Sequence, residues 1–287
     1  MPDLASSIPA LVEIVKNARN SGRSIGFVPT MGALHAGHLK LMQEARREND
    51  FVVVSIFVNP LQFDRKDDLD RYPRTLAADM DVCSTVPVDV VFTPSPAELY
   101  PQEQLAFVDV PDLTTHLCGA FRPGHFRGVA TVVAKLFNIV RPDRAYFGEK
   151  DAQQLAFIRR MVDDLNMPVA IVGIPTVREQ DGLALSSRNK HLNAQQRQLA
   201  TLLPQMLKEA RSRLDEGQRS ASAIREAIES MLRKHAGVRL EYFEIVDPRT
   251  LKPVEHVEDP VLIAGAMWVG STRLIDNMTW PGDQERN

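Results

Sequence analysis

Residues 51 to 58 read Phe-Val-Val-Val-Ser-Ile-Phe-Val, a run in which only the serine is polar. An unbroken run of β-branched and aromatic residues is typical of a strand that is covered on both faces. Shorter runs of this kind alternate with segments that have the apolar spacing of helices, as far as residue 175. This alternation predicts an α/β fold with a doubly wound parallel sheet.

The pattern changes near residue 176. Before that point we expect strands over residues 24–28, 51–58, 88–92, 145–147 and 169–174, and helices over residues 8–20, 37–49, 75–84, 126–140 and 152–165. Beyond it we expect helices over residues 195–214 and 221–235, and strands over residues 240–246, 261–269 and 272–275. Residues 1–176 are therefore predicted to form the sheet domain, and residues 177–287 a smaller α+β domain.

Composition and charge exclude several classes of protein. With 44% hydrophobic and 25% charged residues the chain is globular, and a net charge of -3 leaves no basic footprint for nucleic acid. Cys83 and Cys118 form no closely spaced metal-binding pair and are typical of a reducing compartment. The N-terminus predicts an amphipathic helix, not a signal peptide, and no apolar run reaches the ~18 residues of a membrane span. We expect a cytoplasmic protein that binds neither nucleic acid nor a membrane.

Residues 29–38, PTMGALHAGH, lie between a predicted strand and a predicted helix. His35 and His38 are three residues apart, so they share one helix face and can point at one ligand. The start of a helix favours phosphate through its unpaired N–H groups and its dipole, and Gly32 and Gly37 let a ligand approach the backbone. The alternative is that both histidines only cap the helix in solvent.

Three further polar segments fall where the ligands of a doubly wound sheet collect. In NPLQF, Asn59 and Gln62 can bond a hydroxyl or a carboxylate through their amides, or they only form a turn. In FGEKDAQQ, Lys150 adds a positive charge and Asp151 can accept from ribose hydroxyls, although the same letters also suit a charged helix start. Residues 181–189, DGLALSSRN, pair two hydroxyls with a guanidinium, which suits a polyphosphate, although one serine could instead cap the next helix.

The chain has neither a P-loop nor a G-x-G-x-x-G fingerprint. A histidine pair, a lysine loop and a Ser-Ser-Arg loop together resemble the H-x-G-H type of nucleotidyltransferase, which has a Rossmann-like sheet and cleaves ATP between its α- and β-phosphates. The ordered set PTMGALHAGH, NPLQF, YPRT, RPGHFRGVATVV, FGEKDAQQ and DGLALSSRN resembles more closely the pantoate–β-alanine ligase (pantothenate synthetase) family. The C-terminal third is matched only by its length and by YFEIVD. Leu185 stands where the family more often has methionine, a swap that conserves volume.

The resemblance implies an AMP-forming ligase. The carboxylate of (R)-pantoate would attack the α-phosphorus of ATP, giving pantoyl adenylate and pyrophosphate, and the amine of β-alanine would then displace AMP to give pantothenate. It also implies a homodimer, and Mg²⁺ bound mainly through ATP phosphates and water, since the chain has no dedicated carboxylate cage. The second domain would act as a lid, with its hinge near Pro175.

The resemblance also implies residue roles. His35, His38 and Lys150 would act in catalysis, with His38 at the family's proton-donor position. Gln62 and Gln154 would bind pantoate, with Asn59 as a further substrate-binding candidate. The ATP site would comprise three stretches and one separate residue, namely Met31, Gly32, Ala33, Leu34, His35, Ala36, Gly37 and His38, then Gly148, Glu149, Lys150 and Asp151, then Leu185, Ser186, Ser187 and Arg188, and Val177.

Four other polar residues fit structural roles better. Arg122 and His125 either reach the nucleotide or hold the fold, and we favour the fold. Asp79 and Asp81 either contact Mg²⁺ through water or lie on a solvated helix face, and we favour the helix face. Among rival functions, a class I aminoacyl-tRNA synthetase would need a basic surface, and a non-catalytic nucleotide sensor would lose the substrate-binding glutamines.

Overall fold

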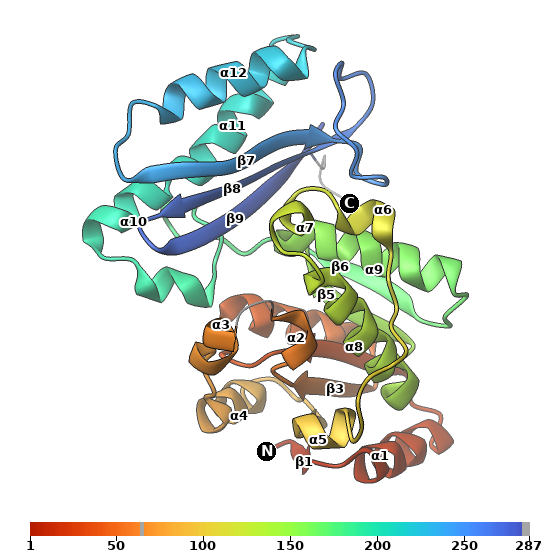
Figure 1. The fold of residues 1–287 in the computed structure, drawn as a ribbon. Helices are drawn as coiled ribbons and strands as arrows, with labels where there is room; N and C mark the ends of the chain where they lie inside the picture. The colour runs from red at the N-terminus through yellow and green to blue at the C-terminus, as the bar shows by residue number, and fades with distance from the viewer. Residues whose placement is uncertain (64–65, 283–287) are drawn as a thin grey trace.

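The computed structural model describes residues 1–63 and 66–282. Its first unit is a parallel sheet with the strand order β1-β4-β3-β2-β5-β6, flanked by helices (Figure 1). Its strands are β1 (Asp3–Ala5), β2 (Ile25–Thr30), β3 (Phe51–Ile56), β4 (Val90–Phe92), β5 (Arg144–Gly148) and β6 (Ala170–Ile174). Its helices are α1 (Ile8–Asn20), α2 (Ala36–Glu48), α3 (Lys66–Arg71), α4 (Leu76–Ser84), α5 (Pro96–Leu99), α6 (Pro111–Thr114), α7 (Cys118–Phe121), α8 (His125–Val140) and α9 (Ala152–Asp164), with short 3₁₀ turns η1 (Pro60–Gln62) and η2 (Glu149–Asp151).

The unbroken apolar run of β3 is explained by burial on both sides. Val53 packs into the hydrophobic cluster that includes α1, α8 and α9, while Val52 and Val54 pack into the cluster that includes α2 and α4. Successive side chains of a strand point to opposite faces, so both faces of β3 must be apolar. The predicted α/β class with a doubly wound parallel sheet is confirmed.

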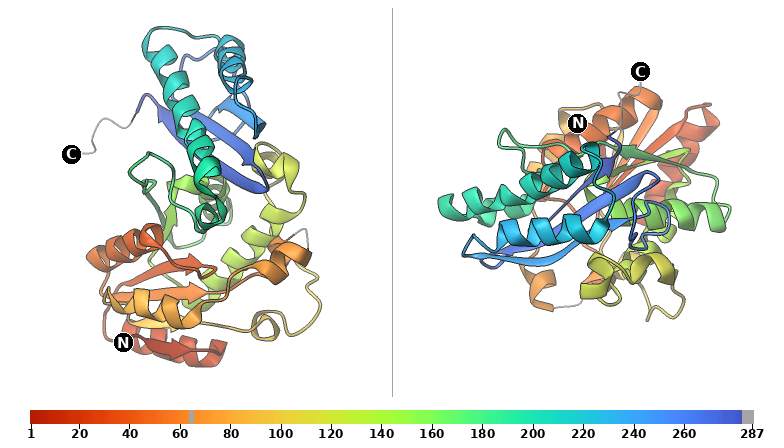
Figure 2. Two further views of the ribbon diagram at one scale, coloured as in Figure 1. Left: turned by 90° about the vertical axis from the view of Figure 1, so that its left-hand side faces the viewer. Right: turned by 90° about the horizontal axis from the view of Figure 1, so that it is seen from above.

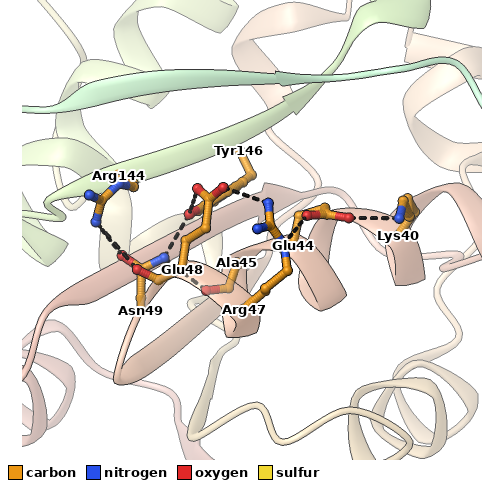
Figure 3. A network of polar contacts seen from close by, with 8 residues as sticks. All are labelled: Lys40, Glu44, Ala45, Arg47, Glu48, Asn49, Arg144 and Tyr146. Carbon is orange, nitrogen blue, oxygen red and sulfur yellow. Dashed lines mark hydrogen bonds and ion pairs between the residues drawn. The ribbon is translucent and has the colours of Figure 1, made fainter. Parts of the chain in front are cut away.

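Helix α2 is fixed to the sheet by a polar network at its C-terminal end (Figure 3). The Asn49 side chain donates to the Ala45 carbonyl at 2.8 Å and to the Tyr146 hydroxyl at 2.7 Å, and that hydroxyl donates to Glu48 at 3.0 Å. A Cβ at Gly26 would lie 2.6 Å from the Asn49 amide nitrogen, so only glycine leaves room for it. His35 and His38 lie at the opposite, N-terminal end of the same helix.

The second unit is an antiparallel sheet with the order β7-β8-β9. Figures 1 and 2 both show it stacked over the first unit, with α11 and α12 on its outer side. Its elements are the 3₁₀ turn η3 (Ser187–His191), α10 (Ala194–Ala200), α11 (Leu202–Asp215), α12 (Ala221–Leu232), β7 (Val238–Val246), β8 (Val261–Val269) and β9 (Thr272–Trp280). Leu262 and Ala264 of β8 join the same cluster as α8 and α9, so the units share part of one core. The boundary at residue 177 therefore stays a prediction.

Two sequence expectations are wrong in detail. The single helix over residues 195–214 is two helices that meet at Thr201, because Pro204 has no N–H to bond the carbonyl four residues earlier. The strand over residues 272–275 continues to Trp280, where its pattern is no longer strictly alternating. Strand β1 escapes sequence reasoning because three residues carry too little pattern.

Candidate active site

A cleft of about 1030 Å³ lies at the carboxyl ends of β2, β3, β5 and β6, between the two sheets. Strands β2 and β5 pair only at Gly26–Arg144 and Phe27–Ala145, so their carboxyl-terminal halves are not paired with each other. The strand order reverses direction at this pair, and such a switch point is where doubly wound sheets bind ligands.

Both histidines of the H-x-G-H segment line this cleft and also cap α2. His35 Nδ1 accepts from the Gly37 N–H at 3.1 Å, and His38 Nδ1 accepts from the His35 N–H at 3.3 Å. A neutral imidazole that accepts at Nδ1 carries its proton on Nε2. Both histidines therefore cap the helix, but they do so inside the cleft and not in solvent, and the Nε2–H of each ring is left as a donor. A Cβ at Gly37 would lie 2.9 Å from His35 Cε1, so the ring position requires glycine there.

The same surroundings keep both imidazoles neutral. Burial lowers the pKa of His38 to about 3, with a smaller contribution from the neighbouring His35. Burial also lowers the pKa of His35, helped by the charges of Lys150 and Lys190. At neutral pH the rings can thus donate hydrogen bonds without carrying a charge.

Asp79 holds the turn that precedes the histidines. Its carboxylate accepts from the Leu34 N–H at 2.7 Å and from the Ala33 N–H at 3.1 Å, and its side chain is buried. Ala33 has a φ of 51° and Gly32 a φ of 81°, and a Cβ at Gly32 would lie 2.9 Å from the Asp79 carboxylate. The expected solvated helix face is therefore wrong for Asp79, although Asp81 is exposed as expected.

Asn59 and Gln62 lie side by side in the cleft wall after β3. Asn59 donates to Gln62 Oε1 at 3.1 Å and to the Gly128 carbonyl at 3.0 Å, and it accepts from the Tyr100 hydroxyl at 2.8 Å. Gln62 in turn donates to Met31 Sδ at 3.0 Å. The Asn59 amide is thus engaged within the protein, whereas Gln62 keeps one amide hydrogen for a ligand.

Two residues of the RPGHF segment, Arg122 and His125, contact the turn that carries Gln62. His125 Nδ1 lies 2.6 Å from the Gln62 carbonyl, and Arg122 lies 3.2 Å from His125 Nε2. Both side chains also line the cleft. These contacts favour the structural role that the sequence suggests for Arg122 and His125.

The lysine loop after β5 adds one positive charge to the cleft. Lys150 Nζ lies 3.8 Å from the Asp151 carboxylate, and its side chain is 17% exposed. In the first turn of α9, Gln153 is buried and donates to the Leu113 and His116 carbonyls at 2.9 and 2.7 Å. Gln154 is partly exposed, lines the cleft, and forms no side-chain hydrogen bond among the described residues. Both glutamines line the cleft, but Gln153 has only its amide oxygen without a partner, whereas the whole Gln154 amide is available to a ligand.

The Ser-Ser-Arg turn forms the opposite side of the cleft. Ser186 caps η3 by accepting from the Arg188 N–H at 3.3 Å, as the alternative reading proposes for one serine, and Arg188 is exposed. The Val177 carbonyl accepts from the Leu185 N–H at 2.9 Å and ties this turn to the end of β6.

The structure brings most of the proposed site residues to this one cleft. Those that line it are Met31, His35, Gly37, His38, Asn59, Gln62, Gly148, Lys150, Asp151, Gln154, Val177, Leu185, Ser186, Ser187 and Arg188. Those that do not are Gly32, Ala33, Leu34, Ala36 and Glu149. Gly32, Ala33 and Leu34 form the turn that contacts Asp79, so they affect the site by positioning the residues that follow them.

Sequence reasoning missed the part of the wall that comes from the second sheet. Trp268, Arg273, Asp276 and Asn277 line the same cleft, as does His191 of η3. No local pattern identifies residues of β9, since their place depends on how the two sheets stack. Among residues 1–63 and 66–282, no helix is long and apolar enough to cross a membrane, and no group of three metal-binding side chains lies together.

The fold and the cleft define a Rossmann-like α/β protein with an H-x-G-H helix start facing a lysine loop. Residues 3–279 match the model of the pantoate–β-alanine ligase family. The pantothenate synthetases of Fervidobacterium nodosum and Heliobacterium modesticaldum are 52% and 53% identical in sequence to this chain. Each match covers 96% of this chain and 98% of the relative. The chain belongs to the pantoate–β-alanine ligase family, and it is therefore an enzyme that forms a carbon–nitrogen bond.

Solved structures agree with this assignment. The crystal structure of pantothenate synthetase from Thermus thermophilus matches with a TM-score of 0.90 and 46% identity, over 96% of this chain and 98% of that one. Pantoate–β-alanine ligase from Francisella tularensis, complexed with β-γ ATP and β-alanine, matches with a TM-score of 0.79 and 35% identity, over 97% of each chain.

Proposed function

We propose that this enzyme condenses (R)-pantoate with β-alanine through a pantoyl adenylate. In the first step a carboxylate oxygen of pantoate attacks the α-phosphorus of ATP, and the bond from that phosphorus to the pyrophosphate oxygen breaks. In the second step the neutral amine of β-alanine attacks the acyl carbon, AMP leaves, and the amine loses a proton to give pantothenate. The adenylate is needed because a free carboxylate is a poor acyl donor.

The observation that carries the proposal is the meeting of neutral imidazole donors, Lys150 and the Ser-Ser-Arg turn around one cleft. We assign the Nε2–H groups of His35 and His38 to oxygens of the departing pyrophosphate, and Lys150 to the α-phosphate. Donors fixed in advance around charge that develops in the transition state are the strongest general source of catalysis. Ser186, Ser187 and Arg188 would close over the phosphates from the opposite wall.

Pantoate is assigned to Gln62 and Gln154, which face the cleft from η1 and α9. Amides can fix both a hydroxyl and a carboxylate without adding a charge that would compete with the attacking oxygen. Asn59 would orient Gln62, since its own amide is already bonded. The main-chain groups near Gly148 and Val177 would hold the ribose and the adenine.

Three further features rest on the family resemblance. Mg²⁺ would enter with ATP, held by the phosphates and by water. Residues 177–287 would close over the bound substrates as a lid. The enzyme would be a cytoplasmic homodimer.

Product analysis tests the reaction. With ATP and pantoate alone we expect pyrophosphate to form up to about one equivalent of enzyme, and β-alanine to restore turnover with AMP as the second product. Formation of ADP would contradict the proposal.

The variant His38→Gln should slow pyrophosphate release by about 100- to 1000-fold, the usual loss when one transition-state donor is removed. Normal turnover in that variant would make His38 structural.

The variant Gln154→Ala tests the substrate assignment. Losing an amide that contacts the carboxylate or hydroxyl of pantoate should weaken its binding by about 10-fold. ATP affinity should stay unchanged, because Gln154 has no part in the phosphate site. Calorimetric titration of each ligand measures the two affinities separately, and an equal loss for both would contradict the assignment.

A further inference from the structure

Strand β9 of the second sheet reaches across the cleft to the backbone of the lysine loop. The side-chain nitrogen of Asn277 donates to the Glu149 carbonyl at 2.9 Å and to the Lys150 carbonyl at 2.8 Å. One amide group thus holds two successive peptide groups of η2. Because it donates both of its hydrogens to them, the position of η2 depends on where β9 lies.

The neighbouring residue ties the same strand to the Ser-Ser-Arg turn. Asp276 is buried and accepts from Arg178 in a two-point contact, at 2.6 and 3.0 Å. Arg178 also donates to the Gly182 carbonyl at 3.1 Å, and its backbone pairs with Ala184. A bidentate contact between a guanidinium and a buried carboxylate is strong and sets the relative orientation of its partners.

The connection continues into the turn itself. The Asn189 amide donates to the Ala184 carbonyl at 3.1 Å and to the Glu179 carboxylate at 2.6 Å, and Arg197 pairs with that same carboxylate at 2.9 Å. Asn189 is the last residue of the DGLALSSRN segment, directly after the exposed Arg188. Hydrogen bonds and short stretches of backbone therefore connect the Ser-Ser-Arg turn through Arg178, Asp276 and Asn277 to the lysine loop.

We propose that Asn277 is a positioning residue for Lys150, and that the pair Asp276–Asn277 keeps the two phosphate-facing loops in one fixed arrangement. The inference rests on the role of Lys150 at the α-phosphate proposed above. Asn277 does not reach the substrate in this role; it holds the peptide groups from which the lysine side chain extends. An error of about 1 Å in the place of a catalytic group can cost about 100-fold in rate.

The test compares three single variants in pyrophosphate release from ATP and pantoate. Asn277→Leu keeps the branched shape of the side chain and removes both donors, and we expect the rate constant of this single-turnover release to fall by about 10- to 100-fold. In the complete reaction, the KM for β-alanine should not change. Lys150→Ala reports the loss when the lysine itself is absent. Thr279→Ala is the matched control, since Thr279 is exposed on the same strand and should leave the rate unchanged.

The double variant, Asn277→Leu with Lys150→Ala, separates a positioning role from a structural one. If Asn277 acts through Lys150, the double variant should be within about 2-fold of Lys150→Ala alone. Losses that multiply would show that Asn277 acts independently of the lysine and would overturn the inference. If Asn277→Leu has a normal rate, the inference falls while the proposed function stands. If Lys150→Ala has a normal rate, the assignment of Lys150 to the α-phosphate is wrong, and the inference about Asn277 falls with it.

Folding is followed in parallel by thermal unfolding of each variant. If Asn277→Leu does not fold, Asn277→Ala replaces it, because truncation of a partly exposed side chain removes the donors without forcing an apolar group between two carbonyls. Asn277→Gln keeps the amide donor and should recover much of the rate. A rate in Asn277→Gln as low as in Asn277→Ala would also contradict the proposed hydrogen bonds.

Discussion

At the scale of single residues, the capping bonds of the histidine pair leave free the ring nitrogens that the proposed catalytic role requires. Each ring uses Nδ1 to accept a backbone N–H at the start of α2, and this leaves the proton on Nε2. Burial then keeps both rings uncharged. Capping and catalysis, which the sequence presents as alternatives, are compatible because they use different nitrogens of the same ring.

The lowered pKa of His38 predicts a pH dependence of stability. In the unfolded chain the imidazole has a pKa of about 6.5, so between that value and about 3 the unfolded state binds the proton more strongly. The stability from a neutral His38 is fully present above pH 6.5 and falls as the pH decreases, by up to about 1.4 kcal/mol per pH unit. Urea unfolding at pH 7.5 and 5.5 measures this fall.

The variant His38→Gln serves as the comparison, because it has no titrating group at that position. The decrease in unfolding free energy between the two pH values should be smaller in the variant than in the wild-type enzyme. Equal decreases would mean that His38 is not kept neutral by the fold.

At the scale of elements, the turn between β2 and α2 depends on α4, although the two segments are far apart in sequence. Asp79 and Cys83 lie one helical turn apart on the buried face of α4, and Asp79 bonds the backbone of Ala33 and Leu34. The spacing of Asp79 from a buried cysteine is a signal that sequence analysis could have used. It does not reveal the partner, which comes from another element.

The variant Asp79→Asn keeps the size of the side chain but places an amide hydrogen where an acceptor is needed. We expect the free energy of unfolding to fall by about 1–3 kcal/mol, and pyrophosphate release to slow, because the turn before His35 loses one of its two acceptors. Asp81→Asn, on the exposed side of the same helix, is the control and should change neither quantity. Urea unfolding and the adenylation assay measure the two effects. If Asp79→Asn behaves like Asp81→Asn in both, the conformation of the turn does not depend on the Asp79 carboxylate.

At the scale of the whole molecule, the cleft is built by two sheets that are joined on both of its sides. On one side Asn277 holds the lysine loop. On the other, Arg273 pairs with Glu241 and donates to Cys118 Sγ at 3.4 Å, and this sulfur lies 3.1 Å from the Tyr242 hydroxyl. Cys118 belongs to α7 of the first unit, so these contacts also bridge the units. Closure of a lid over the substrates would have to keep or exchange both sets of contacts.

The amino-acid sequence by itself determined the class of fold, and it suggested most of the residues of the proposed site. The run of β3, apolar except for its serine, requires cover on both faces, and the segments with His35, His38, Lys150 and Arg188 could be recognised from the sequence. Such features are local, because they depend on residue type and on spacing along one element.

Only the tertiary structure decided which polar atoms meet. It turned Asp79 inward, bonded the amide nitrogen of Gln153 but not that of Gln154 to the protein, and placed Asn277 on the lysine loop. A hydrogen bond depends on the position of two atoms that can be more than a hundred residues apart. The residues next to either partner in the sequence do not predict the contact, so these contacts can be identified only when both sheets are in place.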